Sequence, residues 1–106
     1  MFARVTVYEL PGDRMDEAVE SFRSAFDRIK TLDGFSDGYF LVCADEDRAT
    51  AFTLWETHAA MAGSRVTASR VRTEAARAVD GCVVSAHEYE VAIEAAADSA
   101  GASRYA

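Results

Sequence analysis

The sequence predicts a single α+β domain in which two helices pack on one face of a four-stranded sheet. At 106 residues the chain has the usual length of one domain. Half of the residues are hydrophobic, which is enough for a globular core and argues against disorder over most of the length. Strand-like and helix-like segments follow one another in the order β-α-β-β-α-β, which is the order of the ferredoxin-like sandwich.

The first strand and the first helix are the clearest elements. A strand is expected over residues 2–10, where β-branched and aromatic residues are frequent, and Pro11-Gly12 ends it. Asp13 is then expected to cap a helix, which Asp33-Gly34 ends. Apolar residues recur in this segment at helical spacing and therefore share one face. They are Met15, Ala18, Val19, Phe22, Ala25, Phe26 and Ile29.

A hairpin and a second helical region follow. Residues 35–44 and 49–56 are expected to form the second and third strands, joined by an acidic turn. Thr57 can cap the next helical region, which is expected to break near Gly63-Ser64 and to run to Val79. The side chains expected to face the sheet are small or β-branched: Ala68, Val71, Ala75 and Ala78.

The fourth strand is expected over residues 82–92, after the turn at Asp80-Gly81. Both helices then cover the same face of the sheet, because each crossover is right-handed. The predicted domain covers residues 1–93. Residues 94–106 are rich in alanine, serine and glycine, and we expect them to form a flexible C-terminal tail.

The two middle strands carry apolar side chains on both faces. A sheet with one wet face shows apolar and polar residues in alternation, because neighbouring side chains of a strand point to opposite faces. The second strand lacks this alternation, since both of its faces are apolar: Tyr39, Leu41 and Cys43 on one face, Phe40, Val42 and Ala44 on the other. Exposing one large apolar side chain forgoes about 1.5–3 kcal/mol. The pattern therefore predicts a homodimer that covers the second face.

The composition argues against two classes of partner. The net charge is −7, and an acidic protein repels a phosphate backbone, so nucleic acid is not an expected partner. The longest strongly apolar stretch, residues 39–44, is too short to span a membrane. The first residues alternate like a strand and do not form a signal peptide. We expect a cytoplasmic protein with no membrane partner.

No motif for a metal or a nucleotide cofactor is present. Cys43 and Cys82 lie far apart and inside predicted strands, so we expect two buried free thiols and no disulfide. The histidines and cysteines lack the short spacing of metal ligands, and there is no G-x-G-x-x-G or phosphate loop. Four arginines of the second helical region form either an anion patch or a solvated helix face, and we expect the solvated face. They are Arg65, Arg70, Arg72 and Arg77.

Two short segments in this frame resemble a known family. Residues 34–39 (GFSDGY) and 53–57 (TLWET) are similar to the antibiotic-biosynthesis monooxygenase-like proteins of the dimeric α/β-barrel superfamily. The resemblance extends from Phe2 to about Ile93 and implies a dimeric α/β barrel. Members that are enzymes oxidise phenolic, anthrone or quinol substrates with molecular oxygen and no cofactor. Haem-degrading relatives use an asparagine on the first strand, and this sequence has no asparagine, so haem degradation is not expected.

A cofactor-free oxygenase needs a base that converts its substrate to an anion, and histidine suits this role near neutral pH. His87 is the candidate catalytic base, because it lies beside Tyr89 and is expected to neighbour the first strand, which carries Tyr8. The pocket is expected between the sheet and the helices. Its candidate substrate-binding residues are Trp55, Tyr8, Phe22, Phe26 and His58.

Each candidate also has an ordinary structural explanation. His87 and Trp55 could be core or interface residues, and His58 could be an exposed residue at a helix start. Arg4 could hold an anionic substrate or pair with an acid. The sequence leaves two functions open. One is a cofactor-independent monooxygenase that acts on an aromatic or quinol-type small molecule. The other is a non-catalytic small-molecule-binding or stress-response module built on the same dimer.

Overall fold

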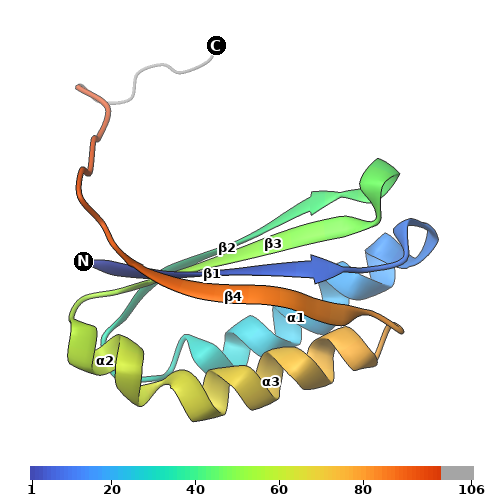
Figure 1. The fold of residues 1–106 in the computed structure, drawn as a ribbon, viewed down its shortest axis with the longest axis horizontal. Coiled ribbons are helices and arrows are strands. Elements are labelled where there is room, and N and C mark those ends of the chain that lie inside the picture. Colours follow the sequence, from blue (N-terminus) through green and yellow to red (C-terminus); the bar gives the residue numbers. More distant parts are fainter. Residues whose placement is uncertain (99–106) are drawn as a thin grey trace.

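The computed structural model describes residues 1–98 and contains a four-stranded antiparallel sheet with its helices on one face (Figure 1). The strand order is β2-β3-β1-β4, and this confirms the predicted ferredoxin-like α+β fold. The elements are β1 (Phe2–Glu9), α1 (Met15–Ile29), β2 (Phe35–Cys43), β3 (Arg48–Trp55), α2 (His58–Gly63), α3 (Arg65–Arg77) and β4 (Cys82–Glu90).

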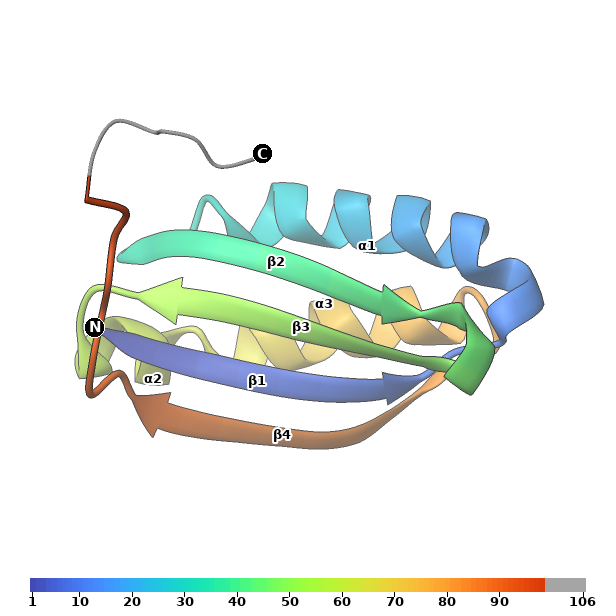
Figure 2. The same cartoon turned by 90° about the horizontal axis from the view of Figure 1, so that it is seen from above.

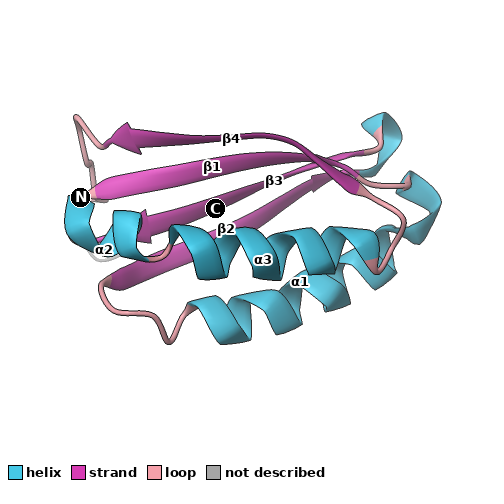
Figure 3. Ribbon diagram, turned by 60° about the horizontal axis from the view of Figure 1, so that its bottom comes forward, coloured by secondary structure: helices cyan, strands magenta, loops and turns pink. Residues whose placement is uncertain are grey.

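The two long helices, α1 and α3, lie side by side beneath the sheet (Figure 3). The apolar stripe of α1 faces the sheet as predicted, and Ala18 and Phe22 are among its most buried residues. The Ser21 hydroxyl donates a hydrogen bond of 2.9 Å to the Ala75 carbonyl and so ties α1 to α3. The core between the helices and the sheet is therefore closed on one side by two helices and on the other by β1 and β3.

The two helix starts differ in how they are capped. Thr57 caps α2 as predicted, because its hydroxyl accepts a 3.0 Å hydrogen bond from the Ala60 amide. The predicted cap by Asp13 is wrong. A 3₁₀ turn occupies Gly12–Arg14, so α1 begins only at Met15 and has no side-chain cap. Asp47 in the β2–β3 connection accepts a 2.7 Å hydrogen bond from the Gly12 amide and fixes this turn.

Two expectations about burial are also wrong. Ala78 is exposed and Ala76 is buried in its place, because α3 ends at Arg77 and Ala78 only caps it. Cys43 and Cys82 are free as expected, but both are exposed. Each lies at the end of an edge strand, which has a neighbouring strand on one side only.

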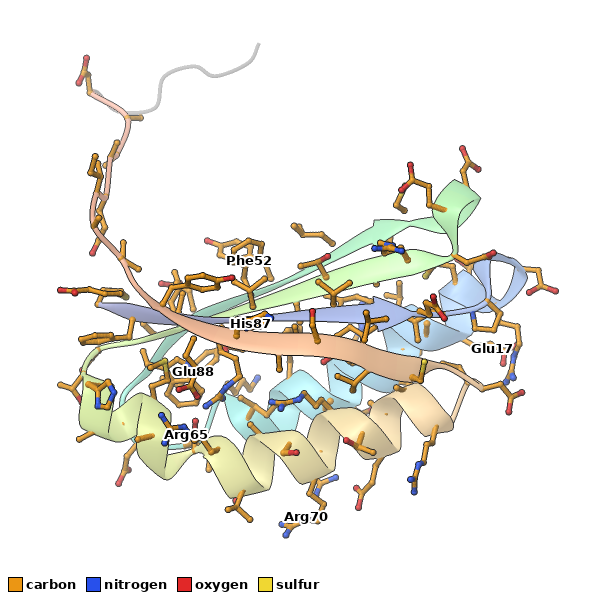
Figure 4. All side chains as sticks on the ribbon, viewed as in Figure 1. Glu17, Phe52, Arg65, Arg70, His87 and Glu88 are labelled. Atoms are coloured by element: carbon orange, nitrogen blue, oxygen red, sulfur yellow. The ribbon has the colours of Figure 1, made fainter. Side chains whose placement is uncertain are left out.

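The face of the sheet away from the helices is uncovered in the single chain (Figure 2). The strand register places Tyr39 opposite Phe52 on this open face, and Phe52 points away from the helices (Figure 4). Several large apolar residues of the sheet are about half exposed: Tyr39 (54%), Leu41 (50%), Val84 (51%) and Tyr89 (51%). The sheet therefore has a large apolar surface that the helices do not cover.

The C-terminal segment follows β4. Of the predicted flexible tail over residues 94–106, residues 94–98 have no regular secondary structure and residues 99–106 lie outside the described part of the chain. None of the helices described is long and apolar enough to cross a membrane.

Candidate functional site

A small cavity lies between the sheet and the two long helices. Its volume is about 20 Å³, which is close to the space that one water molecule occupies. Phenyl, aliphatic and methyl groups form most of its wall: Phe22, Ala25, Phe26, Ile29, Ala51 and Ala68. Polar side chains form the rest: Arg4, Thr6, Tyr8, Thr53 and Arg72. A cluster of polar side chains thus faces a cavity inside a core that is otherwise apolar.

The period of β1 explains why three of these polar residues meet. Arg4, Thr6 and Tyr8 are alternate residues of one strand, and all three are buried on the helix face of the sheet. The intervening residues point to the open face. The guanidinium of Arg4, the hydroxyl of Thr6 and the phenol of Tyr8 therefore all point into the cavity.

Aromatic rings form one wall of the cavity. Phe22 stacks on Phe40 with ring centroids 4.5 Å apart, and it meets Tyr8 edge-on at 4.7 Å. Phe26 is half-buried and lies over Gly38, where a side chain would come within 3.1 Å of the Phe26 ring. The missing side chain at Gly38 therefore leaves room for Phe26 at this wall.

Tyr8 is a neutral hydrogen-bond donor at physiological pH. Burial raises the pKa of its hydroxyl from 10.0 to about 12, while the nearby charge of Arg72, the Thr6 side chain and the charge of Arg4 oppose this rise. The phenol therefore keeps its proton and can donate a hydrogen bond to an oxygen atom of a bound molecule.

Arg4 is held rigidly by the chain. Its guanidinium donates hydrogen bonds to the Met61 carbonyl at 2.9 Å, the Glu88 carboxylate at 3.0 Å and the Ser64 hydroxyl at 3.1 Å. It also lies 5.7 Å from the centre of the Trp55 ring. Only 4% of Arg4 is exposed, so its charge acts inside the core.

Glu88 is the carboxylate that compensates this buried charge. It pairs with the Arg65 guanidinium on α3 and with Arg4 on β1, and Figure 4 shows Glu88 and Arg65 together between β4 and α3. Hydrogen bonds from Arg65, and then from Arg4, lower the pKa of Glu88 from 4.5 to about 2. Glu88 is therefore a structural anion and a very weak base.

Arg72 is the functional candidate that sequence reasoning missed. It was grouped with Arg65, Arg70 and Arg77 as part of a solvated helix face, but it is only partly exposed and lines the cavity. It follows Ala68 by four residues and so shares the sheet-facing side of α3. The signal in the sequence that identifies Arg72 is this four-residue spacing from Ala68, a member of the predicted apolar stripe. Arg70 points away from the sheet, as expected (Figure 4).

Two nitrogens of Arg72 have no hydrogen-bond partner. Nε and Nη1 are both buried, and no acceptor among the described residues meets them. Burial lowers the pKa of this guanidinium, and the charge of Arg4 lowers it further, while Tyr8 and Glu88 act in the opposite direction. A buried donor without a partner is costly, so these nitrogens mark a place for an acceptor.

The structure brings three of the predicted site residues together in the cavity, namely Tyr8, Phe22 and Phe26. Trp55 is close by but does not line it. The indole is fully buried and donates a 3.0 Å hydrogen bond to the Thr53 hydroxyl. His58 is exposed at the start of α2, where its ring meets Phe2 edge-on at 5.5 Å.

His87 lies apart from these residues. The strand register pairs it with Val5, whereas Tyr8 pairs with Val83, so His87 and Tyr8 point to opposite faces of the sheet. The expected proximity of His87 to Tyr8 is therefore wrong. His87 is exposed near Tyr89, with ring centroids 6.5 Å apart. Glu88 faces Arg4 on the helix side of the sheet. His87 is the adjacent residue of the same strand and therefore points to the open face.

Within residues 1–98 no three histidine, cysteine, aspartate or glutamate side chains form a group that could hold a metal ion. The cavity itself offers guanidinium, hydroxyl and phenol groups, all of which can donate hydrogen bonds. Its chemistry is therefore that of binding a negative charge next to an aromatic or aliphatic body.

The strand order and the helices on one face define a class of protein, the ferredoxin-like α+β proteins. No family model matches the chain, and no curated protein matches it. Solved structures do match. The cofactor-independent oxygenase SnoaB from Streptomyces nogalater superposes with a TM-score of 0.69 at 14% identity, over 88% of this chain and 94% of SnoaB.

Two further neighbours show the range of proteins that share this fold. The heme-degrader MhuD from Mycobacterium tuberculosis, with two hemes bound in its active site, has a TM-score of 0.65 at 18% identity. The match covers 91% of this chain and 100% of MhuD. A conserved protein from Methanosarcina mazei has a TM-score of 0.63 at 11% identity, over 83% of this chain and 89% of that one. The resemblance seen in the sequence is confirmed at the level of the fold.

Proposed function

We propose that this protein is a cofactor-independent monooxygenase that oxidises an aromatic or quinol-type small molecule in the cavity beneath the sheet. The observation that carries the proposal is the convergence of Arg4, Arg72 and Tyr8 beside the rings of Phe22 and Phe26. Cationic and neutral donors in a largely apolar, aromatic site stabilise a phenolate or enolate more than the neutral substrate. An electron-rich substrate anion is the species that reacts with oxygen.

The reaction needs no cofactor, because the substrate, molecular oxygen and a water molecule that accepts the proton are sufficient. The substrate loses a proton to water and becomes an anion, whose formation the two guanidinium charges favour. The anion passes one electron to oxygen, and the resulting radical and superoxide combine to form a carbon–oxygen bond. Protonation gives a hydroperoxide, which loses water and leaves a carbonyl. A methylene carbon and one oxygen molecule thus become a carbonyl and one water.

Access to the cavity requires that its wall opens. A volume of about 20 Å³ is much smaller than an aromatic ligand needs. Phe26 is the wall residue best placed to move, because it is half-buried and lies against the backbone of Gly38. Rotation of a partly exposed side chain is fast, on the order of nanoseconds.

We also propose that the protein acts as a homodimer through the open face of the sheet. The support is the row of half-exposed apolar side chains on β2 and β4, which include Leu41 and Tyr89. A twofold pair covers such a surface on both subunits at once. The cavity lies on the opposite face, so each subunit contains its own site.

Oxygen consumption by the purified metal-free protein tests the function. We expect protein-dependent uptake with a member of a panel of anthrones and quinols, and a loss of about 100-fold in Tyr8→Phe, because the variant lacks one oxyanion donor. Tyr39→Phe is the matched control, since it removes a phenol from the open face. Equal rates in Tyr8→Phe and Tyr39→Phe, or no uptake with any compound, would contradict the proposal.

His87→Ala separates the two faces of the sheet. The sequence made His87 the candidate base, and the cavity chemistry predicts that its loss leaves oxygen uptake within a few-fold of the wild type, because it lies across the sheet from Tyr8. A loss as large as that of Tyr8→Phe would place the reaction on the open face and restore His87 as the base.

A non-catalytic binding module is the second candidate. It is favoured by the lining of the cavity, in which the described residues include no histidine or carboxylate that could take a proton. In that case a small aromatic compound binds and is recovered unchanged. Product analysis after incubation under oxygen distinguishes the two functions.

A further inference from the structure

Arg72 lies where the cavity meets the surface. Together with Arg4, it lines both the cavity and a shallow depression between α3 and β4. The outer depression is also lined by Ser69, Glu88 and, at its edge on β4, His87. A molecule that occupies the cavity and extends to this depression therefore passes the Arg72 guanidinium.

The charges at this end of the cavity do not balance. Arg4 and Arg65 share the single carboxylate of Glu88, and the ion pairs of the described residues include none for Arg72. Nε and Nη1 of Arg72 also lack hydrogen-bond partners among those residues. An unpaired guanidinium beside a second buried one is unfavourable, although the protein as a whole has a net charge of −7.

We propose that the ligand of this cavity carries a carboxylate, which Arg72 binds at the α3–β4 opening while its aromatic body lies against Phe22 and Phe26. The proposal rests on the proposed use of this cavity as the ligand site. It adds the substrate class, an aromatic acid, and assigns Arg72 as the residue that selects it.

A carboxylate fits this position better than other oxygen groups. It is ionised at neutral pH, whereas a phenol has an ordinary pKa near 10 and must first lose a proton. Its charged oxygens also accept a stronger, charge-assisted hydrogen bond from an unpartnered nitrogen of Arg72 than a neutral oxygen does. A neutral amide can accept a hydrogen bond through its carbonyl oxygen, but it carries no charge to compensate the guanidinium.

The test compares 2-naphthoate with 2-naphthamide by isothermal titration calorimetry. We expect the wild-type protein to bind the acid at least tenfold more tightly than the amide, a difference of about 1.4 kcal/mol. Arg72→Met, which keeps an unbranched apolar stem and removes the charge, should abolish this preference. Arg70→Met is the matched control, because Arg70 lies on the exposed side of the same helix and should keep it.

Urea unfolding gives a second measurement that a purely structural arginine would change differently. Because Arg72 has unpartnered buried nitrogens, Arg72→Met should unfold at a urea concentration no lower than Arg70→Met does. A lower midpoint for Arg72→Met would overturn the assignment and make Arg72 a structural residue. This measurement also shows directly whether the variant folds.

Three binding results would overturn the proposal: equal affinities for the acid and the amide, equal losses in Arg72→Met and Arg70→Met, or no binding of either compound. Binding of 2-naphthol as tightly as 2-naphthoate would equally refute selection of a carboxylate. Oxygen uptake is scored separately. Selective binding of the acid without turnover of any aromatic acid refutes the oxygenase function and supports the carboxylate site. Turnover without selectivity for the acid supports the oxygenase function and refutes the carboxylate site.

Discussion

Replacement of Glu88 by glutamine is expected to lower the free energy of unfolding by about 2–3 kcal/mol at neutral pH. Glu88 is the only carboxylate among the described residues that pairs with Arg4, a residue that is 4% exposed. Removing one partner of a fully buried ion pair costs about 3–5 kcal/mol, because it leaves the other charge uncompensated. The Glu88 side chain is 24% exposed, so water screens part of this effect.

The pKa shift of Glu88 gives a second estimate of its contribution to the free energy of unfolding, and this estimate is of similar size. A fall in the pKa of Glu88 from 4.5 to about 2 corresponds to about 3 kcal/mol, reduced because the first cause is the solvent-exposed Arg65. Because the folded-state pKa is lowered, this stability is complete above pH 4.5 and is lost as the pH falls towards 2. The difference between wild type and Glu88→Gln should therefore narrow across that window.

Urea denaturation followed by Trp55 fluorescence measures this effect, since Trp55 is the only tryptophan of the sequence. Glu74→Gln is the matched control, because Glu74 forms a surface pair with Arg28 at 3.4 Å and 58% of its side chain is exposed. We expect this control to lose less than about 1 kcal/mol. If Glu88→Gln costs no more than Glu74→Gln, or if the difference does not narrow in acid, the account of Arg4 as a buried charge held by Glu88 is refuted.

Two further predictions concern the cavity and the open face. Since the pKa of Tyr8 is raised to about 12, the fold should lose about 2–3 kcal/mol of stability as the pH rises from 10 to 12, and urea unfolding of Tyr8→Phe should lack this loss. A wild-type curve as flat as that of Tyr8→Phe would contradict the burial of this phenol. Leu41→Arg should convert the proposed dimer to a monomer in analytical ultracentrifugation, because it places a charge on the apolar open face. Val66→Arg on the exposed side of α3 should leave the dimer intact, and a dimeric Leu41→Arg protein would place the interface elsewhere.

The fold could be predicted because local and global signals agree along most of the chain. The helical spacing that includes Ala18 and Phe22 identifies one face of α1, and that face is buried in the structure. Thr57 and the break near Gly63 define α2 in the same way. The Asp13 cap failed for a tertiary reason, since the Gly12 amide is held by Asp47, a residue distant in sequence. Local propensity could not reveal this contact.

The site was less predictable because it depends on strand register. His87 and Tyr8 were placed together on the basis of neighbouring strands, but His87 pairs with Val5, which is three residues from Tyr8 on β1 and therefore points to the opposite face. Arg72 was hidden among three other arginines, because charge alone does not show which side chain faces inward. Only its spacing from Ala68 carried that information.

The measurement that tests the central claim most directly is an NMR titration of the labelled protein with a compound that it oxidises or, failing turnover, with 2-naphthoate. The account predicts that the largest amide shifts cluster on the cavity side, at Tyr8, Phe22 and Arg72. Shifts that cluster instead on the open face, around Tyr39 and Leu41, would contradict the assignment of the cavity as the functional site.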